Sequence, residues 1–290
     1  MSSSALAHYI SKNYQRRKLI NQWMILLLGL GSVLALIPLL SISFYVVSQG
    51  IHGLSFNFFT RLPQPVGEPD GGMANSILGT LTLILMASAI GVPWGIATGL
   101  YLSEYDRGRM STFVRFSADL LSSIPSIIIG LFVYALVVVP MKRFSVLAGG
   151  IALGIIMIPT LARSTEELLR TVPLHVREAG LALGLPRWKV ILRIVLIGSS
   201  RSIATAVILA VARVSGETAP LLFTSFNNQY WQRGLDQPIS SLPVQVYNYA
   251  ISPYDEWHQQ AWAGALILVS IVFIMNILTR YLLNHHERTS

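Results

Sequence analysis

Six long apolar segments dominate the hydrophobic pattern of this chain: approximately residues 23–48, 73–102, 116–140, 145–163, 202–225 and 261–283. Each is long enough, at about 1.5 Å of helix rise per residue, to cross roughly 30 Å of hydrocarbon. The first is uncharged between Met24 and Val47 and is longer than the apolar core of a cleaved secretory signal, so we expect it to remain as an anchor. The pattern predicts an all-α integral membrane protein with six transmembrane helices.

Composition and charge agree with a membrane location. Hydrophobic residues make up 53% of the 290 residues and charged residues 12%, more apolar surface than a soluble domain of this size can bury, so we expect membrane lipid to cover much of it. Of the 21 lysines and arginines, 16 fall on one side of the predicted spans and 4 on the other. The positive-inside rule then predicts a multi-pass protein of the cell inner (plasma) membrane with both termini cytoplasmic. No basic patch interleaved with exposed aromatics indicates nucleic-acid binding.

The spans divide the chain into a transmembrane core and flanking parts. We expect a cytoplasmic tail over 1–22, a first helix and periplasmic loop over 23–72, a core over 73–284 with a cytoplasmic loop over 166–201, and a cytoplasmic tail over 285–290. The outward loop over 226–260 carries several aromatic residues, which suit either the membrane surface or an extracytoplasmic partner. They are Tyr230, Trp231, Tyr247, Tyr249, Tyr254 and Trp257.

Proline and glycine modify the predicted spans. Pro93, Pro125 and Pro159 each remove a backbone hydrogen bond, so we expect helix kinks or gating points there. Glycines in the second and fourth spans favour close helix packing. These are Gly79, Gly91, Gly95, Gly99, Gly149, Gly150 and Gly154.

The loop between the fourth and fifth spans contains a predicted helical hairpin. Pro173 suits a first helical turn, Gly184 a left-handed terminating residue, and Pro186 the start of a second helix. Glu178, Ala179 and Gly180, followed by Gly184, resemble the EAA loop of ABC importer permeases. The resemblance implies that this loop docks on a separate ATPase subunit and transmits its closure to the membrane helices.

The sequence lacks the residues that would let this chain bind ATP, so a separate ATPase would have to supply the energy. The chain has no Gly-Lys dipeptide, so a phosphate-binding P-loop is absent. It has no cysteine, and its histidines are scattered among tails and loops without paired carboxylates in a span. We therefore predict no catalytic residues, no metal site and no cofactor.

Two opposite charges fall inside the fifth predicted span. Arg213 lies near its centre with Glu217 four residues later, and both must face protein or a wet cavity because a central charge costs about 2.5–3.5 kcal/mol in lipid. Guanidinium offers a planar fork of donors suited to phosphate-like oxygens, so Arg213 and Glu217, with Ser215 and Thr218 as further donors, are candidates for an anion path. A structural salt bridge is the alternative. Asp119, near the cytoplasmic end of the third span, is expected as a cap or interface partner, with a role in the path as the alternative.

The run from Gly216 to Thr224, with Leu242-Pro243-Val and Ala261-Trp262-Ala-Gly264, resembles the phosphate-specific ABC permease family of PstA type. The resemblance extends from Gly71 over most of the chain. It implies a type I, MetI-like permease fold that moves inorganic phosphate by alternating access. It also implies as partners a second permease subunit, a cytoplasmic ATPase dimer and an extracytoplasmic phosphate-binding protein. Alternatives are a permease for another oxyanion such as sulfate or molybdate, and an ion-coupled secondary carrier.

Overall fold

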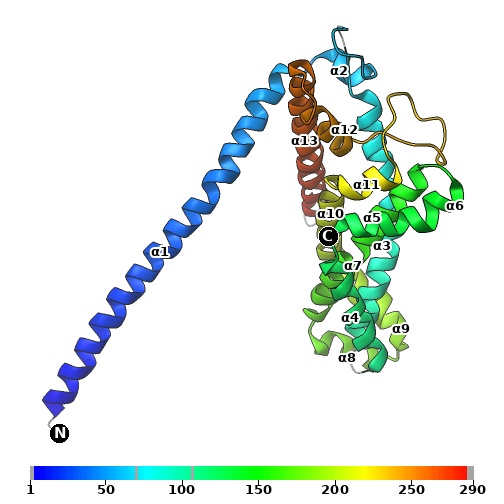
Figure 1. The fold of residues 1–290 in the computed structure, drawn as a ribbon. Helices are drawn as coiled ribbons and strands as arrows, with labels where there is room; N and C mark the ends of the chain where they lie inside the picture. The colour runs from blue at the N-terminus through cyan, green and yellow to red at the C-terminus, as the bar shows by residue number, and fades with distance from the viewer. Residues whose placement is uncertain (1–2, 69–70, 106–107, 286–290) are drawn as a thin grey trace. The chain divides into compact units, whose positions relative to one another are not determined.

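The computed structural model describes residues 3–68, 71–105 and 108–285, with side chains from residue 14 to residue 277 within these ranges. The described residues form helices and no strand, as the hydrophobic pattern predicts (Figure 1). They divide into two compact units, Met1–Gln49 and Gly50–Ser290. Residues 286–290 of the predicted C-terminal tail, and with them Arg288, lie outside the described residues.

The first unit consists of most of α1 (Ser3–His52). The stretch Tyr14–His52 is long and apolar enough to cross a membrane, and none of its most apolar window is buried within the chain. Pro38 lies inside the helix without ending it. The first predicted span is therefore confirmed as a helix.

The second unit contains three further helices that can span a membrane: α3 (Ala74–Glu104), α7 (Val146–Arg170) and α13 (Asp255–His285). Two more candidate spans are bent pairs. In one, α4 (Arg109–Ser123) meets the segment Ser126–Met141 at 102°, and in the other Arg187–Leu196 meets α10 (Ser200–Ser215) at 68°. With each bent pair counted as one span and α1 included, the described residues provide up to six candidate spans, the number predicted.

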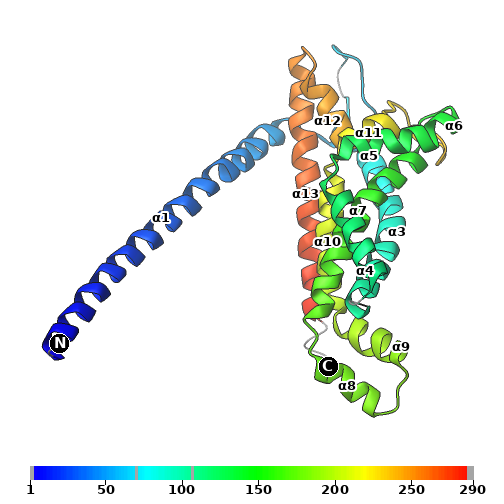
Figure 2. The ribbon, with the colours of Figure 1, turned by 60° about the horizontal axis from the view of Figure 1, so that its bottom comes forward.

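Shorter helices complete the second unit. They are α2 (Phe56–Thr60), α5 (Ser126–Val133), η1 (Tyr134–Val138), α6 (Val139–Met141), α8 (Leu174–Ala182), α9 (Arg187–Lys189), η2 (Val190–Leu196), α11 (Ala219–Thr224) and α12 (Leu242–Ala250). The segments η1 and η2 are π-helical. Figures 1 and 2 show α8 and α9 at one end of this unit and α12 near the opposite end.

The seam between α3 and α7 is the most extensive helix contact among the described residues of the second unit. A Cβ atom added at Gly95 would lie 2.5 Å from Leu161 Cβ, and one added at Gly150 would lie 2.7 Å from Met86 Cβ. Glycines on each helix that face larger side chains on the other allow the two backbones to approach closely. The predicted close packing is confirmed for the glycines on this seam. These glycines are Gly91, Gly95, Gly99, Gly149, Gly150 and Gly154.

The end that carries α12 is held by buried polar contacts. Ser76 Oγ and Ser240 Oγ lie 2.6 Å apart, and the Leu242 backbone N–H donates to Thr80 Oγ1 at 2.8 Å. Tyr249 is buried, 4% exposed, and stacks on Trp257 at 4.6 Å between ring centroids. Burial raises the pKa of the Tyr249 phenol. Tyr249 is therefore part of the packed interior, which neither alternative for the aromatic loop foresees.

The outer surface of the second unit is apolar in many places. Large side chains such as Leu85, Trp94, Leu209, Phe273 and Ile274 are exposed. A soluble protein rarely exposes this much contiguous apolar surface. Lipid and partner subunits are the environments in which such a surface is stable.

Candidate functional site

Arg213 lies in the last turn of α10, with its side chain exposed. Its Nη1 donates to Thr160 Oγ1 of α7 at 3.3 Å. Within the part of the chain that the structure describes, no carboxylate lies within ion-pair distance of this guanidinium. The charge is held in place by a neutral hydroxyl, so most of its donors remain available to an anion.

Within the described residues, Glu217 does not form a salt bridge with Arg213, the alternative considered for these two charges. The helix ends at Ser215, Gly216 caps it, and the Glu217 backbone N–H donates to Val214 O at 3.2 Å in the turn that follows. Pro220 in the first turn of α11 explains part of the break, because proline has no N–H to donate to the carbonyl of Gly216, four residues earlier, and its ring clashes with that carbonyl in a continuous helix. The prediction of one continuous span from 202 to 225 is therefore wrong, and so is the i, i+4 geometry.

The two neighbouring hydroxyls differ in their availability. Ser215 is buried, and its Oγ donates to Ala212 O of its own helix at 2.7 Å. Thr218 precedes α11 as its N-cap without a side-chain capping bond. Thr218 and Glu217 are half-buried, and within the described residues neither side chain makes a hydrogen bond. The turn 216–218 thus presents a carboxylate and a hydroxyl beside an exposed arginine.

Pro125 marks the other sharp break. The 102° bend separates α4 from the helices beyond it at Ile124 and Pro125, whereas α3 and α7 continue through Pro93 and Pro159. Beyond the bend, α5 packs on α11. A Cβ atom added at Gly130 would lie 2.6 Å from Pro220 Cα. The helices that follow the breaks at Pro125 and at Gly216 therefore touch each other.

The predicted hairpin is present between α7 and α10. Gly184 has a φ of 76°, its backbone N–H donates to Leu181 O at 2.9 Å, and the Leu185 N–H donates to Gly180 O at 3.3 Å. This pair of bonds is the Schellman arrangement that ends a helix. Gly180 is buried, and a Cβ atom there would lie 2.8 Å from Ile194 Cδ1 of η2. Glycine therefore lets α8 pack closely on η2, while Glu178 and Ala179 are exposed.

The hairpin is attached to the ends of α3 and α7. Arg177 Nη1 donates to Glu104 Oε1 in an ion pair, and Arg177 Nη2 donates to Leu169 O at 2.8 Å. Arg187 Nη2 donates to Glu104 O at 2.9 Å, and its guanidinium lies 5.1 Å from the centroid of the Tyr105 ring. Burial, and then the charge of Arg187, lower the pKa of the Arg177 guanidinium. Beside these contacts is a pocket of about 650 Å³ that these side chains help to line.

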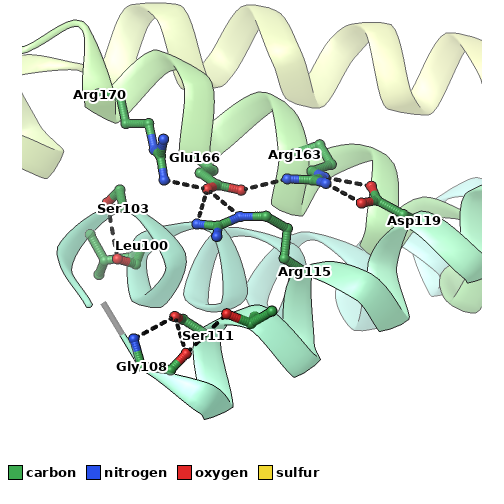
Figure 3. A network of polar contacts seen from close by, with 10 residues as sticks. Leu100, Ser103, Gly108, Ser111, Arg115, Asp119, Arg163, Glu166 and Arg170 are labelled. Atoms are coloured by element: carbon green, nitrogen blue, oxygen red, sulfur yellow. Dashed lines mark hydrogen bonds and ion pairs between the residues drawn. The ribbon is translucent and has the colours of Figure 1, made fainter. Parts of the chain in front are cut away.

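A cluster of ion pairs joins α4 to α7 near the hairpin (Figure 3). Glu166 is almost fully buried, 4% exposed, and accepts from Arg115 Nη2 at 2.6 Å, Arg170 Nη2 at 2.9 Å and Arg163 Nη1 at 3.1 Å. Arg163 also donates through Nε to Asp119 Oδ1 at 2.8 Å, and through Nη2 to Asp119 Oδ2. Asp119 is thus an interface partner, as expected.

The sequence prediction missed Glu166 and Thr160. Glu166 lies just past the predicted end of the fourth span, and its spacing to Arg163 and Arg170, three and four residues, was the available signal for a helical ion-pair series. Its link to Arg115 joins residues 51 apart, which spacing does not reveal. No group of His, Cys, Asp or Glu side chains within the described ranges is arranged to hold a metal ion.

The fold defines the class of protein: an integral membrane subunit with the type I ABC importer permease fold. A chain of the inward-facing MetNI methionine ABC transporter superposes with a TM-score of 0.58 and 17% identity, over 73% of this chain and 92% of that chain. A chain of a bacterial alginate ABC transporter in complex with its periplasmic protein gives 0.65 and 14%, over 91% and 95%.

The chain belongs to the family of binding-protein-dependent transport system inner membrane components, whose pattern covers residues 91–286. The phosphate transport system permease protein PstA of Yersinia pestis is 46% identical over 257 residues, 88% of this chain and 87% of the relative. That of Haemophilus influenzae is 42% identical over 93% of this chain and 96% of the relative. A probable PstA of Methanocaldococcus jannaschii is 33% identical over 89% and 91%.

Proposed function

We propose that this chain is a permease subunit of an ATP-driven ABC importer that carries inorganic phosphate across the cytoplasmic membrane by alternating access. The observation that carries the proposal is Arg213, an exposed guanidinium at a helix break whose contact within the described chain is a neutral hydroxyl. The names of the relatives, phosphate transport system permease proteins, support phosphate as the cargo.

The proposed path runs past the break between α10 and α11. Arg213 binds the anion through its fork of donors, and Thr218 donates a further hydrogen bond. Glu217 repels the anion and so favours its release, while Ser215 keeps α10 intact up to the break through its bond to Ala212 O. The bend at Pro125 gates the path together with this break, and Pro93 and Pro159 are secondary points of flexibility within α3 and α7.

The hairpin is the proposed element that receives the movement of the ATPase subunit and transmits it to the membrane helices. Its exposed apolar side chains, Leu174, Leu181, Leu183 and Trp188, form a surface for an ATPase subunit. Glu178 and Ala179 extend this surface, and Gly180 and Gly184 fix the shape of the hairpin. In the proposed topology the hairpin and both termini are cytoplasmic. The working complex adds a second permease subunit, a cytoplasmic ATPase dimer and an extracytoplasmic phosphate-binding protein.

The test of cargo is transport by the reconstituted complex. Proteoliposomes that contain this chain, the second permease and the ATPase should take up radiolabelled phosphate only with ATP on the ATPase side and binding protein on the other. Excess sulfate or molybdate should leave the rate unchanged. Uptake without ATP would indicate an ion-coupled carrier, and competition by sulfate or molybdate would indicate a broader oxyanion permease.

The test of coupling is Gly184→Val. A β-branched residue is strained at a φ of 76°, so the turn that ends α8 should deform. A strain of about 1–2 kcal/mol predicts a fall of about tenfold in phosphate transported per ATP hydrolysed, with membrane insertion intact. Uptake and ATP hydrolysis are measured on the same vesicles.

The matched control is Gly198→Ala, because no atom lies within 4 Å of a Cβ at Gly198 and this glycine has no positive φ. Gly198→Ala should transport normally. Full coupling in Gly184→Val would remove the hairpin from the proposed mechanism.

A further inference from the structure

Arg163 lies next to the proposed path, one helical turn from Thr160 on α7. Residues three apart occupy the same face of a helix and are separated by about 4.5 Å along its axis. Thr160 holds Arg213, so Arg163 is the next cation on this face in the direction of the hairpin.

The two carboxylates that bind Arg163 differ in how firmly they are held. Glu166 is 4% exposed and is shared by three arginines. Asp119 is 54% exposed, and its hydrogen bonds within the described residues go to Arg163. Figure 3 shows Arg163 between the two, with the fork of Nε and Nη2 directed at Asp119. Asp119 is therefore the partner that can leave without opening the cluster.

The donors of Arg163 suit an anion. The fork that Asp119 occupies is the same bidentate geometry that binds two oxygens of a phosphate. A phosphate and Asp119 would thus compete for the same donors.

We propose that Arg163 is a second anion-binding site on the path, here called the second station. The Asp119 carboxylate occupies this site when no anion is bound and is displaced when an anion binds. This inference rests on the proposed path past Arg213. A phosphate that leaves Arg213 takes the Nε and Nη2 donors from Asp119, whose carboxylate turns to solvent. When the phosphate departs, Asp119 binds Arg163 again, and the closed pair opposes the return of anions from the cytoplasm.

Binding at this station is measured through a single cysteine, since the chain contains none. Ser122 is exposed and lies one turn beyond Asp119 on α4. In the reconstituted complex, we expect inorganic phosphate to slow modification of Ser122→Cys by an anionic thiol reagent, relative to chloride at equal ionic strength. Asp119→Asn should lower the phosphate concentration for half-protection by about tenfold or more, since it removes a charged competitor. Arg163→Gln should abolish protection.

The matched control is Asp236→Asn, which breaks an ion pair of similar exposure, with Arg143 at 56% and Asp236 at 50%. It should leave protection unchanged. Absence of protection with Asp119 intact overturns the proposal even if Asp119→Asn does not fold. An unchanged half-protection concentration in a folded Asp119→Asn overturns it too, and indicates a fixed scaffold pair.

The variant Arg213→Gln, combined with Ser122→Cys, separates the two proposals. If Arg213→Gln loses uptake while phosphate fails to protect Ser122→Cys in the chain that keeps Arg213, the second station is wrong and the path past Arg213 stands. If it loses uptake and protection persists, both proposals are supported. Normal uptake by Arg213→Gln contradicts the path itself.

Discussion

Arg213→Gln should reduce phosphate uptake by about thirtyfold or more, because removing one charged partner of a desolvated anion costs about 2–5 kcal/mol. The folded state should be little affected. The guanidinium is exposed, and the bond it gives up is a single one of 3.3 Å to Thr160. The measurement is the initial rate of radiolabelled phosphate uptake by the reconstituted complex, with the amount of inserted protein determined on the same vesicles.

Two further variants sharpen this result. Arg213→Lys keeps the charge but loses the planar fork, so its uptake should be intermediate. Thr160→Val keeps the whole guanidinium and removes the hydroxyl that orients it, so the loss should be about tenfold at most. Normal transport by Arg213→Gln would instead assign this arginine to the scaffold of the permease.

Glu166→Gln should be the most destabilising of the single substitutions considered. The carboxylate is 4% exposed and contacts three arginines, so its neutralisation leaves their partly exposed guanidinium groups without this buried counter-charge. Removing one partner of a buried ion pair typically costs about 3–5 kcal/mol. We expect a clear fall in the temperature at which the complex unfolds in detergent, measured by tryptophan fluorescence or by scanning calorimetry.

The neighbouring residue provides the control. Glu167 is exposed on the same helix, one position along, and its side chain makes no hydrogen bond or ion pair in the described residues. Glu167→Gln removes the same charge and should leave the unfolding temperature nearly unchanged. Equal effects of the two substitutions would mean that net charge, rather than the buried cluster, determines the stability.

Local patterns in the sequence predict the elements that local forces form. The apolar segments predict the spans because lipid requires long uninterrupted helices. The hairpin follows from Pro173, Gly184 and Pro186, since each residue favours one backbone conformation at its own position. Close helix packing was predicted at the glycines of α3 and α7 for a similar reason, because small residues let backbones approach, but the pairing of these two helices was not predicted.

The features that sequence analysis missed depend on distant residues. The end of α10 at Ser215 follows from Pro220 together with the packing of α11 on Gly130, 90 positions earlier in the chain. The ion pairs of Glu166 with Arg115 and of Arg163 with Asp119 join helices 51 and 44 residues apart. Periodicity along one helix identifies the residues on a face, but not the helix that will pack against it.

The glycine seam has a mechanical consequence. Backbones that touch at Gly95 and Gly150 leave no room for α3 and α7 to slide or rotate separately, so the two helices move together. The hairpin is attached to both helices at the same end, through Glu104 and Leu169. A force on the hairpin would therefore tilt α3 and α7 as a pair, with most of the bending near Pro125 and Gly216 and less at Pro93 and Pro159.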